Sequence, residues 1–197
     1  MTTSQPLEPA LLVYREILEG DLRKLQATSN DDPDAGGGAR DLRFDWNAFR
    51  PVMHRIFSKE ATGRGGKTIR TATISYLDAD QLSQTTTMAY WPPTEKRPWE
   101  DRVSRVHASP ALRPDLLLTD LGRVFVTFTL FTDGTVRCDY AYEQDFRDEN
   151  AWAPAVRDIV LGCLDATDAK NGHRTNNRVP TQGYYDFSTG KRYCHAE

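Results

Sequence analysis

Apolar and polar positions alternate most regularly over residues 123–142, where two strand-like runs flank an Asp-Gly pair at 133–134. This pattern predicts a β-hairpin. A two-residue loop would set Leu130 beside Arg137 and mix apolar with charged positions. A three-residue loop over 132–134, with its glycine at positive φ, keeps one face apolar and is therefore the predicted turn. The register that follows pairs Leu130 with Val136, Phe128 with Cys138 and Val126 with Tyr140.

Several other stretches place apolar residues at helical spacing. Leu11, Tyr14 and Leu18 predict a helix from about residue 10 to residue 25. A second helix is predicted from about Arg50, because Pro51 fits only the first turn of a helix. The remaining helical predictions are a short helix at 99–106, a helical turn at 115–121, and a helix marked by Trp152, Val156, Ile159, Val160 and Cys163.

Two pairs of strand-like segments accompany these helices. Residues 68–76 and 85–91 are rich in threonine and aromatic residues, which favours a second hairpin, and the segments 184–187 and 191–194 predict a small terminal one. The glycine-rich stretch 28–40 is predicted to be a flexible loop. The predicted fold is therefore a single α+β domain over 1–197, with a central antiparallel sheet, flanking helices and a C-terminal extension over 169–197.

The composition narrows the range of functions. A chain of 197 residues with 39% hydrophobic residues is long enough to bury one core. The net charge of −3 gives no reason to expect direct binding to nucleic acid or to a membrane. Three widely spaced cysteines without C-x-x-C spacing argue against a disulfide framework or structural zinc, and with the absence of a signal-like segment they favour the cytoplasm.

No motif specifies a reaction. The segment 61–68 contains the glycines, lysine and threonine of a relaxed phosphate-binding loop, but a helix precedes it and a strand follows it, the reverse of what such a loop needs. The four histidines lack metal-binding spacing. We therefore assign no catalytic residue, no metal ligand and no cofactor from the sequence.

The second face of the predicted hairpin is polar and is the candidate binding surface. On a purely structural interpretation, this face is a solvated sheet surface with cross-strand polar pairs. On a functional interpretation, it is a surface that attracts a basic partner. The charge distribution favours the functional interpretation, because residues 133–168 contain nine acids against three arginines, whereas 169–197 is net basic. The candidate partner-binding residues are Arg137, Asp139, Glu143, Asp145, Asp148 and Glu149.

The same region resembles a known family. The run Phe128-Thr129-Leu130, the Asp-Gly turn, the run Asp139-Tyr140-Ala141-Tyr142-Glu143 and a following Trp152 are similar to the pattern of the YezG-like immunity family of bacterial polymorphic toxin systems. The resemblance covers about residues 124–152. It implies a small α+β protein that binds and neutralises a cognate toxin, commonly a nuclease, in the producing cell, and it implies no catalytic residue.

The sequence thus leaves two hypotheses. The first is an immunity protein that contacts its toxin through the acidic hairpin face and the loop after it. The second is a small cytosolic enzyme whose site is assembled from dispersed residues such as Arg105, His107 and Asp139. A deep pocket with converging histidine and carboxylate groups would favour the enzyme.

Overall fold

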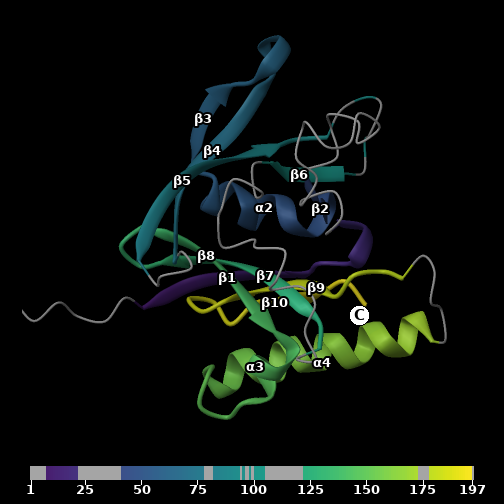
Figure 1. The fold of residues 1–197 in the computed structure, drawn as a ribbon. Coiled ribbons are helices and arrows are strands. Elements are labelled where there is room, and N and C mark those ends of the chain that lie inside the picture. Colours follow the sequence, from purple (N-terminus) through teal and green to yellow (C-terminus); the bar gives the residue numbers. More distant parts are fainter. Residues whose placement is uncertain are drawn as a thin grey trace, which may run out of the picture.

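The computed structural model describes residues 8–21, 41–77, 82–93, 95, 98, 100–104, 122–172 and 178–196. It is dominated by one curled sheet of ten strands that forms a half-barrel, and 45% of the described residues are in strands against 28% in helices (Figure 1). The predicted α+β class, a central antiparallel sheet with flanking helices, is therefore wrong, and the fold is β-rich. The reason is that two segments with helix-like spacing, Pro9–Glu16 and Glu100–Ser104, are strands of this sheet.

The elements follow one another along the chain in an order that differs from their order in the sheet. Across the sheet the strands are arranged β10-β9-β1-β7-β8-β4-β5-β6-β2, and β3 pairs with β4 beside this path. The pairs are antiparallel except β4 with β8, which is parallel and makes the sheet mixed. The elements are β1 (Pro9–Glu16), β2 (Leu42–Asp45), α2 (Trp46–Ile56), β3 (Lys59–Thr62), η1 (Arg64–Gly66), β4 (Thr68–Leu77), β5 (Ser83–Trp91), β6 (Glu100–Ser104), β7 (Val124–Phe131), β8 (Val136–Tyr142), α3 (Glu143–Arg147), α4 (Pro154–Asn171), β9 (Gln182–Asp186) and β10 (Arg192–Cys194).

The first apolar run is a strand and not the predicted helix. β1 lies between β7 and β9, and the four residues from Leu11 to Tyr14 are each at most 1% exposed. A strand that is buried on both faces requires a continuous apolar run, and such a run also satisfies helical spacing over a short window. The helix-like spacing of Leu11 and Tyr14 is therefore a by-product of two-sided burial.

Two further helix predictions need correction, and two predictions lie outside the described residues. The segment predicted as a helix at 99–106 contains β6, which pairs with β2 and β5. Helix α2 begins at Trp46, a turn earlier than predicted, and so contains Pro51 in its interior. The predicted loop at 28–40 and helical turn at 115–121 fall in segments that the structure does not describe.

The predicted central hairpin is confirmed in detail. β7 and β8 pair Leu130 with Val136, and the register continues to Val124 with Tyr142. The three-residue turn is closed by the Gly134 N–H, which donates to the Phe131 carbonyl at 3.0 Å, and Gly134 has a φ of +85°. The β4–β5 hairpin, the terminal β9–β10 hairpin and the helix after Trp152 are confirmed as well.

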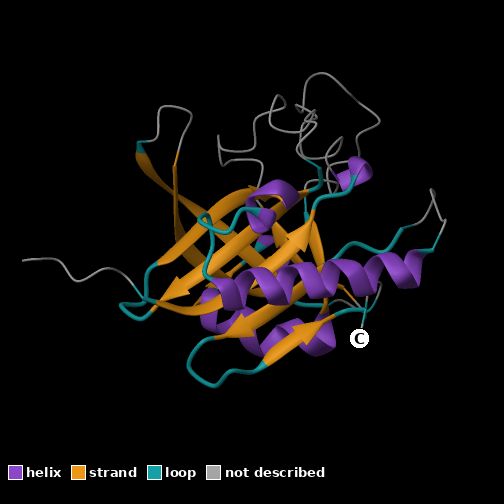
Figure 2. Cartoon of the chain, turned by 90° about the horizontal axis from the view of Figure 1, so that it is seen from below, coloured by secondary structure: helices purple, strands orange, loops and turns teal. Residues whose placement is uncertain are grey.

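The sheet carries a core on each face. The concave side encloses α2, which buries Phe49 and Met53 against β1, β4, β5 and β7 (Figure 1). Helices α3 and α4 cover the other side, where Phe125 packs with Phe146 and Val160, and Figure 2 shows α4 crossing the strands. The second hairpin face, predicted to be partly wet, is thus largely covered.

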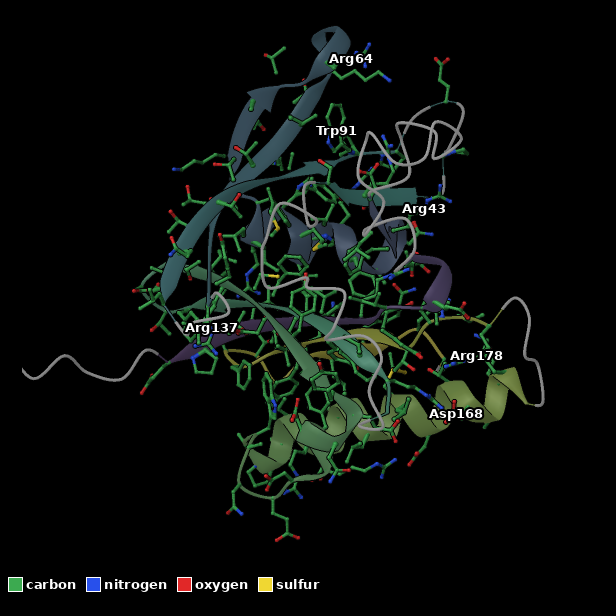
Figure 3. The ribbon with its side chains drawn as sticks, in the orientation of Figure 1. Arg43, Arg64, Trp91, Arg137, Asp168 and Arg178 are labelled. Carbon is green, nitrogen blue, oxygen red and sulfur yellow. A yellow bond between two sulfur atoms is a disulfide. The ribbon has the colours of Figure 1, made fainter. Side chains whose placement is uncertain are left out.

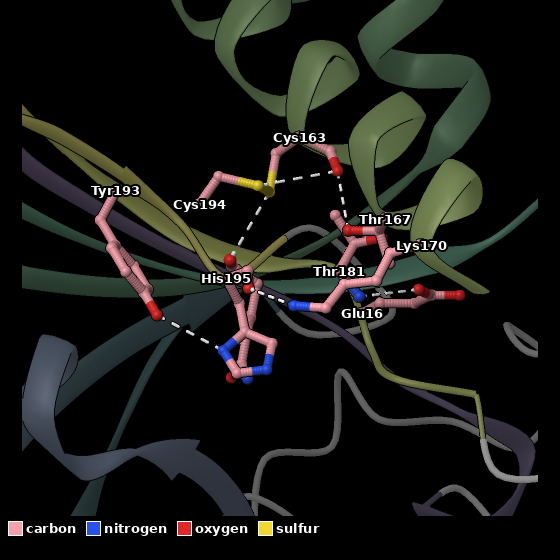
Figure 4. The surroundings of a disulfide bond; sticks show 9 residues. Glu16, Cys163, Thr167, Lys170, Thr181, Tyr193, Cys194 and His195 are labelled. Carbon is pink, nitrogen blue, oxygen red and sulfur yellow. Dashed lines mark hydrogen bonds between the residues drawn. A yellow bond between two sulfur atoms is a disulfide. The ribbon is translucent and has the colours of Figure 1, made fainter. Parts of the chain in front are cut away.

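The C-terminal segment is part of the sheet rather than an extension of it. β9 pairs with β1 and β10 pairs with β9, so the two strands form one end of the sheet, and α4 continues to Asn171, into the segment predicted to be an extension. A disulfide joins Cys163 of α4 to Cys194 of β10, contrary to the expectation from the cysteine spacing (Figure 4). No helix within the described ranges is long and apolar enough to cross a membrane.

Candidate partner-binding site

Arg137 and Asp139 lie on the outer part of β8 with one residue between them. Residues two apart on a strand share a face, and the Arg137 Nε lies 2.6 Å from the Asp139 Oδ2. The Arg137 guanidinium carbon also lies 5.9 Å from the centroid of the Phe131 ring. The two charges offset each other, so this part of the predicted surface is polar without being strongly acidic.

Glu143 and Asp145 have roles in the local structure of α3. The Asp145 Oδ2 accepts the Tyr142 backbone N–H at 2.6 Å, which satisfies a donor at the start of the helix. The Glu143 Oε1 accepts from the Arg147 Nη2 at 2.7 Å, one helical turn further on. Both carboxylates also lie at the helix N-terminus, where negative charge is favoured. These two residues therefore shape the surface more than they add free charge to it.

Asp148 and Glu149 form the exposed part of the acidic loop, and they are the acids most available to a partner. Asp148 accepts the Asn150 N–H at 2.9 Å, and Glu149 makes neither a hydrogen bond nor an ion pair to any residue of the described part. Two more exposed acids, Asp158 and Asp165, lie seven residues apart on α4 and hence on one helix face. The acidic surface therefore runs from this loop along α4.

An apolar cleft of about 270 Å³ opens beside the acidic loop, and we call it the Trp152 cleft. The Trp152 ring lies 5.1 Å from the Phe146 ring, which holds the indole in place from the core side. Leu12 and Val156 are both nearly fully buried, and Arg137 and Thr129 are the polar members. The lining residues are Pro9, Leu12, Thr129, Phe131, Arg137, Ala151, Trp152, Ala153, Val156 and Phe187.

The sequence did not reveal this cleft. Pro9 and Phe187 come from opposite ends of the chain and meet because β1 lies between β7 and β9. The sequence analysis predicts Trp152 only as one of the residues that mark a helix, and its half-buried position follows from the way α4 crosses the sheet. The one available signal was its closeness in sequence to Asp148 and Glu149.

The dispersed enzyme site predicted as the alternative is described only in part. Arg105 and His107 lie outside the described residues, and the Asp139 carboxylate is held by Arg137. Within the described ranges, no three histidine, cysteine, aspartate or glutamate side chains are grouped as metal ligands would be.

A buried pair of titratable groups lies in the concave core, away from the cleft. The Tyr90 hydroxyl donates to the Asp101 Oδ2, and both residues are at most 1% exposed. Burial raises the pKa of Asp101 in spite of this hydrogen bond and the nearby Arg50 guanidinium, and burial together with Asp101 raises the pKa of Tyr90 strongly. Burial, with Arg70 and Arg50, lowers the pKa of His54, whose ring lies 5.6 Å from that of Tyr90. Because Tyr90 and Asp101 are almost completely buried, we assign the pair to the core.

The raised pKa of Asp101 makes a prediction about stability. The folded protein holds the Asp101 proton more tightly than the unfolded chain, whose pKa is 3.8, so this group's contribution to stability falls as the pH rises from about 3.8 through the raised pKa. Asp101→Asn remains neutral throughout. Denaturant unfolding over pH 4–8 is expected to show the variant gaining stability relative to the wild type as the pH rises. A difference that is constant with pH would contradict the raised pKa.

In comparisons with known proteins, no family model and no curated protein matches this chain. The fold and the Trp152 cleft are therefore the observations from which a function has to be inferred.

Proposed function

We propose that this protein is a binding protein that recognises a basic partner protein through the Trp152 cleft and the acidic loop. The observation that carries the proposal is their adjacency, because Asp148 and Glu149 lie three or four residues before Trp152 and Ala151 lines the cleft. Protein interfaces commonly combine an apolar centre, enriched in tryptophan and other aromatic residues, with a polar rim. The Trp152 cleft supplies such an apolar, aromatic centre, and the acidic loop supplies a polar rim.

The two parts of the surface have different physical roles. The cleft offers Phe131, Trp152 and Phe187 to an apolar side chain of the partner, and burial of that side chain would supply much of the affinity. The exposed acids Glu149 and Asp158 would accelerate association with a positively charged surface and set its orientation. We therefore expect the partner to present an apolar side chain within a basic surface.

From the sequence resemblance we further propose that the partner is a cognate toxin, commonly a nuclease in such systems, and that binding neutralises it. A nuclease surface that binds nucleic acid is basic, which agrees with an acidic recognition surface. Neutralisation by binding needs no catalytic residue and no cofactor. The proposed location is the cytoplasm of the producing cell, where a toxin of this kind acts. The disulfide favours an oxidising environment, so the location rests on the proposed function and no longer on the cysteines.

The test is binding to the purified product of the adjacent gene, measured by calorimetry and by association kinetics. Ala151→Arg places a long charged side chain at the mouth of the cleft from an exposed position, and should weaken binding about 30-fold or more. Glu149→Lys should slow association, most strongly at low salt. Glu95→Lys changes the charge equally at an exposed position between β5 and β6 and serves as the matched control.

Circular dichroism and thermal unfolding confirm that each variant is folded. Wild-type affinity in Ala151→Arg would show that the cleft is not the recognition site. Equal effects of Glu149→Lys and Glu95→Lys would show that the acidic loop has no specific part in recognition. An adjacent gene product that fails to bind the wild-type protein at micromolar concentration would reject the proposed function.

A further inference from the structure

Two strands, β3 and β8, pair with different parts of the same edge of β4, and a gap, which we call the notch, remains between them. β3 pairs with the first part of β4, up to Thr71 with Lys59, while β8 pairs with β4 at a single position, Ser75 with Arg137. In Figure 1, β3 lies along the projecting part of β4, and the β7–β8 hairpin meets its other end. β5 occupies the opposite edge without interruption. Between Thr71 and Ser75, therefore, none of the strands that the structure describes covers this edge of β4.

The backbone of Thr73 faces this notch. The Gly63 N–H donates to the Lys67 carbonyl at 2.7 Å, so in the regular β3–β4 register that follows, Ile69 and Thr71 direct their backbone groups toward β3. These directions alternate along a strand, and the β4–β5 register is continuous through residues 70–77. Thr73 therefore presents its N–H and C=O to the open edge.

The notch is a cleft of about 290 Å³ with an apolar floor and a polar rim. Its floor contains Ile56, Ala72 and Val136, all buried. The exposed Lys59 makes no ion pair to any residue of the described part, and no acidic side chain lines the cleft. The nearby Asp133 carboxylate is engaged by the Thr135 N–H at 2.9 Å and the Thr135 hydroxyl at 2.7 Å. The rim residues are Ser58, Lys59, Thr73, Ser75, Thr85, Gly134 and Thr135.

We propose that this notch binds the carboxyl-terminal end of an extended peptide, which adds to β4 as a short strand. An exposed strand edge recognises an extended peptide through backbone hydrogen bonds, and here Thr73 supplies one donor and one acceptor. Lys59, with the Ser58 hydroxyl beside it, provides the positive end that a terminal carboxylate requires. The four residue steps from Thr71 to Ser75 span about 13 Å, which admits two or three residues. The apolar floor accepts one small side chain.

The notch is distinct from the Trp152 cleft, and this inference does not rest on the proposed function. The Trp152 cleft uses Thr129, Phe131 and Arg137, whereas the notch uses Gly134, Thr135 and Val136, so the two sites lie on different sides of the same hairpin end. A defect in one site therefore leaves the other testable.

Hydrogen exchange of the free protein tests whether the edge is open. The Thr73 amide is expected to exchange much faster than the amides of Thr71 and Ser75, which face β3 and β8, and of Ala72 and Ile74, which face β5. Amide-resolved exchange by NMR measures this pattern. Protection of Thr73 equal to that of Thr71 would show that the notch is closed and would overturn the proposal.

Binding is tested by NMR titration with acetyl-Val-Val carrying a free carboxylate, and with the same dipeptide as its carboxamide. The free carboxylate is expected to give saturable shifts at Thr73 and Thr135 at millimolar concentration, and the carboxamide to bind about tenfold more weakly. Lys59→Ala should abolish this difference between the two peptides. Lys67→Ala removes an exposed cation at the tip of the β3–β4 hairpin and should leave it unchanged.

Shifts centred on the Trp152 cleft, equal effects of the two lysine variants, or no saturation by either peptide would each overturn the proposal. Thr85→Trp, which fills the notch from an exposed position on β5, supplies the negative control and should remove binding of both peptides.

Discussion

Glu16→Ala is expected to lower the free energy of unfolding by about 3–5 kcal/mol. The Glu16 side chain is only 2% exposed and stands at the end of β1, where its Oε1 lies 2.8 Å from the Arg178 Nη2. Its Oε2 accepts the Thr181 N–H at 3.0 Å, a contact that Figure 4 shows. Alanine would leave a buried backbone donor and a partly buried guanidinium without their acceptor. Urea unfolding monitored by tryptophan fluorescence measures the loss.

Glu16 belongs to a larger network of charged side chains. The Arg123 Nε lies 3.8 Å from the Glu16 Oε1, and the Arg123 Nη2 lies 2.8 Å from the Asp168 Oδ2. Burial lowers the pKa of Arg123, but its hydrogen bond to the Asp168 carboxylate and the negative charges of Glu16, Asp168 and Glu143 raise the pKa by more, so the net pKa is raised. In Figure 3, Asp168 and Arg178 both lie toward the C-terminal end of α4. The network thus connects β1, α4 and the segment before β9.

Two variants distinguish charge from geometry at this position. Glu16→Gln keeps an acceptor for Thr181 and removes the charge, so it should lose less stability than the alanine variant. Glu60→Ala breaks an exposed pair with Arg70 at 2.8 Å and should cost at most about 1 kcal/mol. If Glu16→Ala were no more destabilising than Glu60→Ala, the buried network would have no stabilising role.

Removal of the disulfide is expected to lower the free energy of unfolding by about 4 kcal/mol. The bond closes a loop between residues separated by 31 positions, and a cross-link of this span restricts the unfolded chain by about that amount. It fixes α4 to β10 over the core that contains Tyr14 and Phe125. We expect Cys163→Ala/Cys194→Ala to unfold at a correspondingly lower denaturant concentration.

The wild-type protein provides the control for the disulfide. Added reductant should lower its stability to that of the double variant and should leave the double variant unchanged. Alkylation in denaturant should label one cysteine before reduction, Cys138, and three after it. Labelling of all three cysteines without reductant would show that the bond does not form in solution.

Local patterns were sufficient where one strand pair or one helix decided the structure. The β7–β8 register followed from the need to keep Leu130 and Phe128 on one face and from a glycine at the turn, since a slip by one residue exchanges the faces of a strand. The helix at α4 followed in the same way from the spacing of Val156, Val160 and Cys163.

Local patterns failed where burial depended on elements distant in sequence. β1 has neighbours at residues 124–131 and 182–186, and only these neighbours make its run from Leu11 to Tyr14 a strand. The same neighbours bring Cys194 within reach of Cys163, although 31 positions separate them. Sequence spacing carries no information about such an approach.

The same distinction between local pattern and distant contacts applies to the candidate site. By itself, the sequence determined that acids cluster after the central hairpin, because charge is a property of the residues and not of their arrangement. Only the tertiary structure decided which of them are available, since Asp139, Glu143 and Asp145 are held by neighbours while Glu149 is exposed. It also decided that Pro9, Trp152 and Phe187 form one cleft, because a cleft is created by the packing of segments that are remote along the chain.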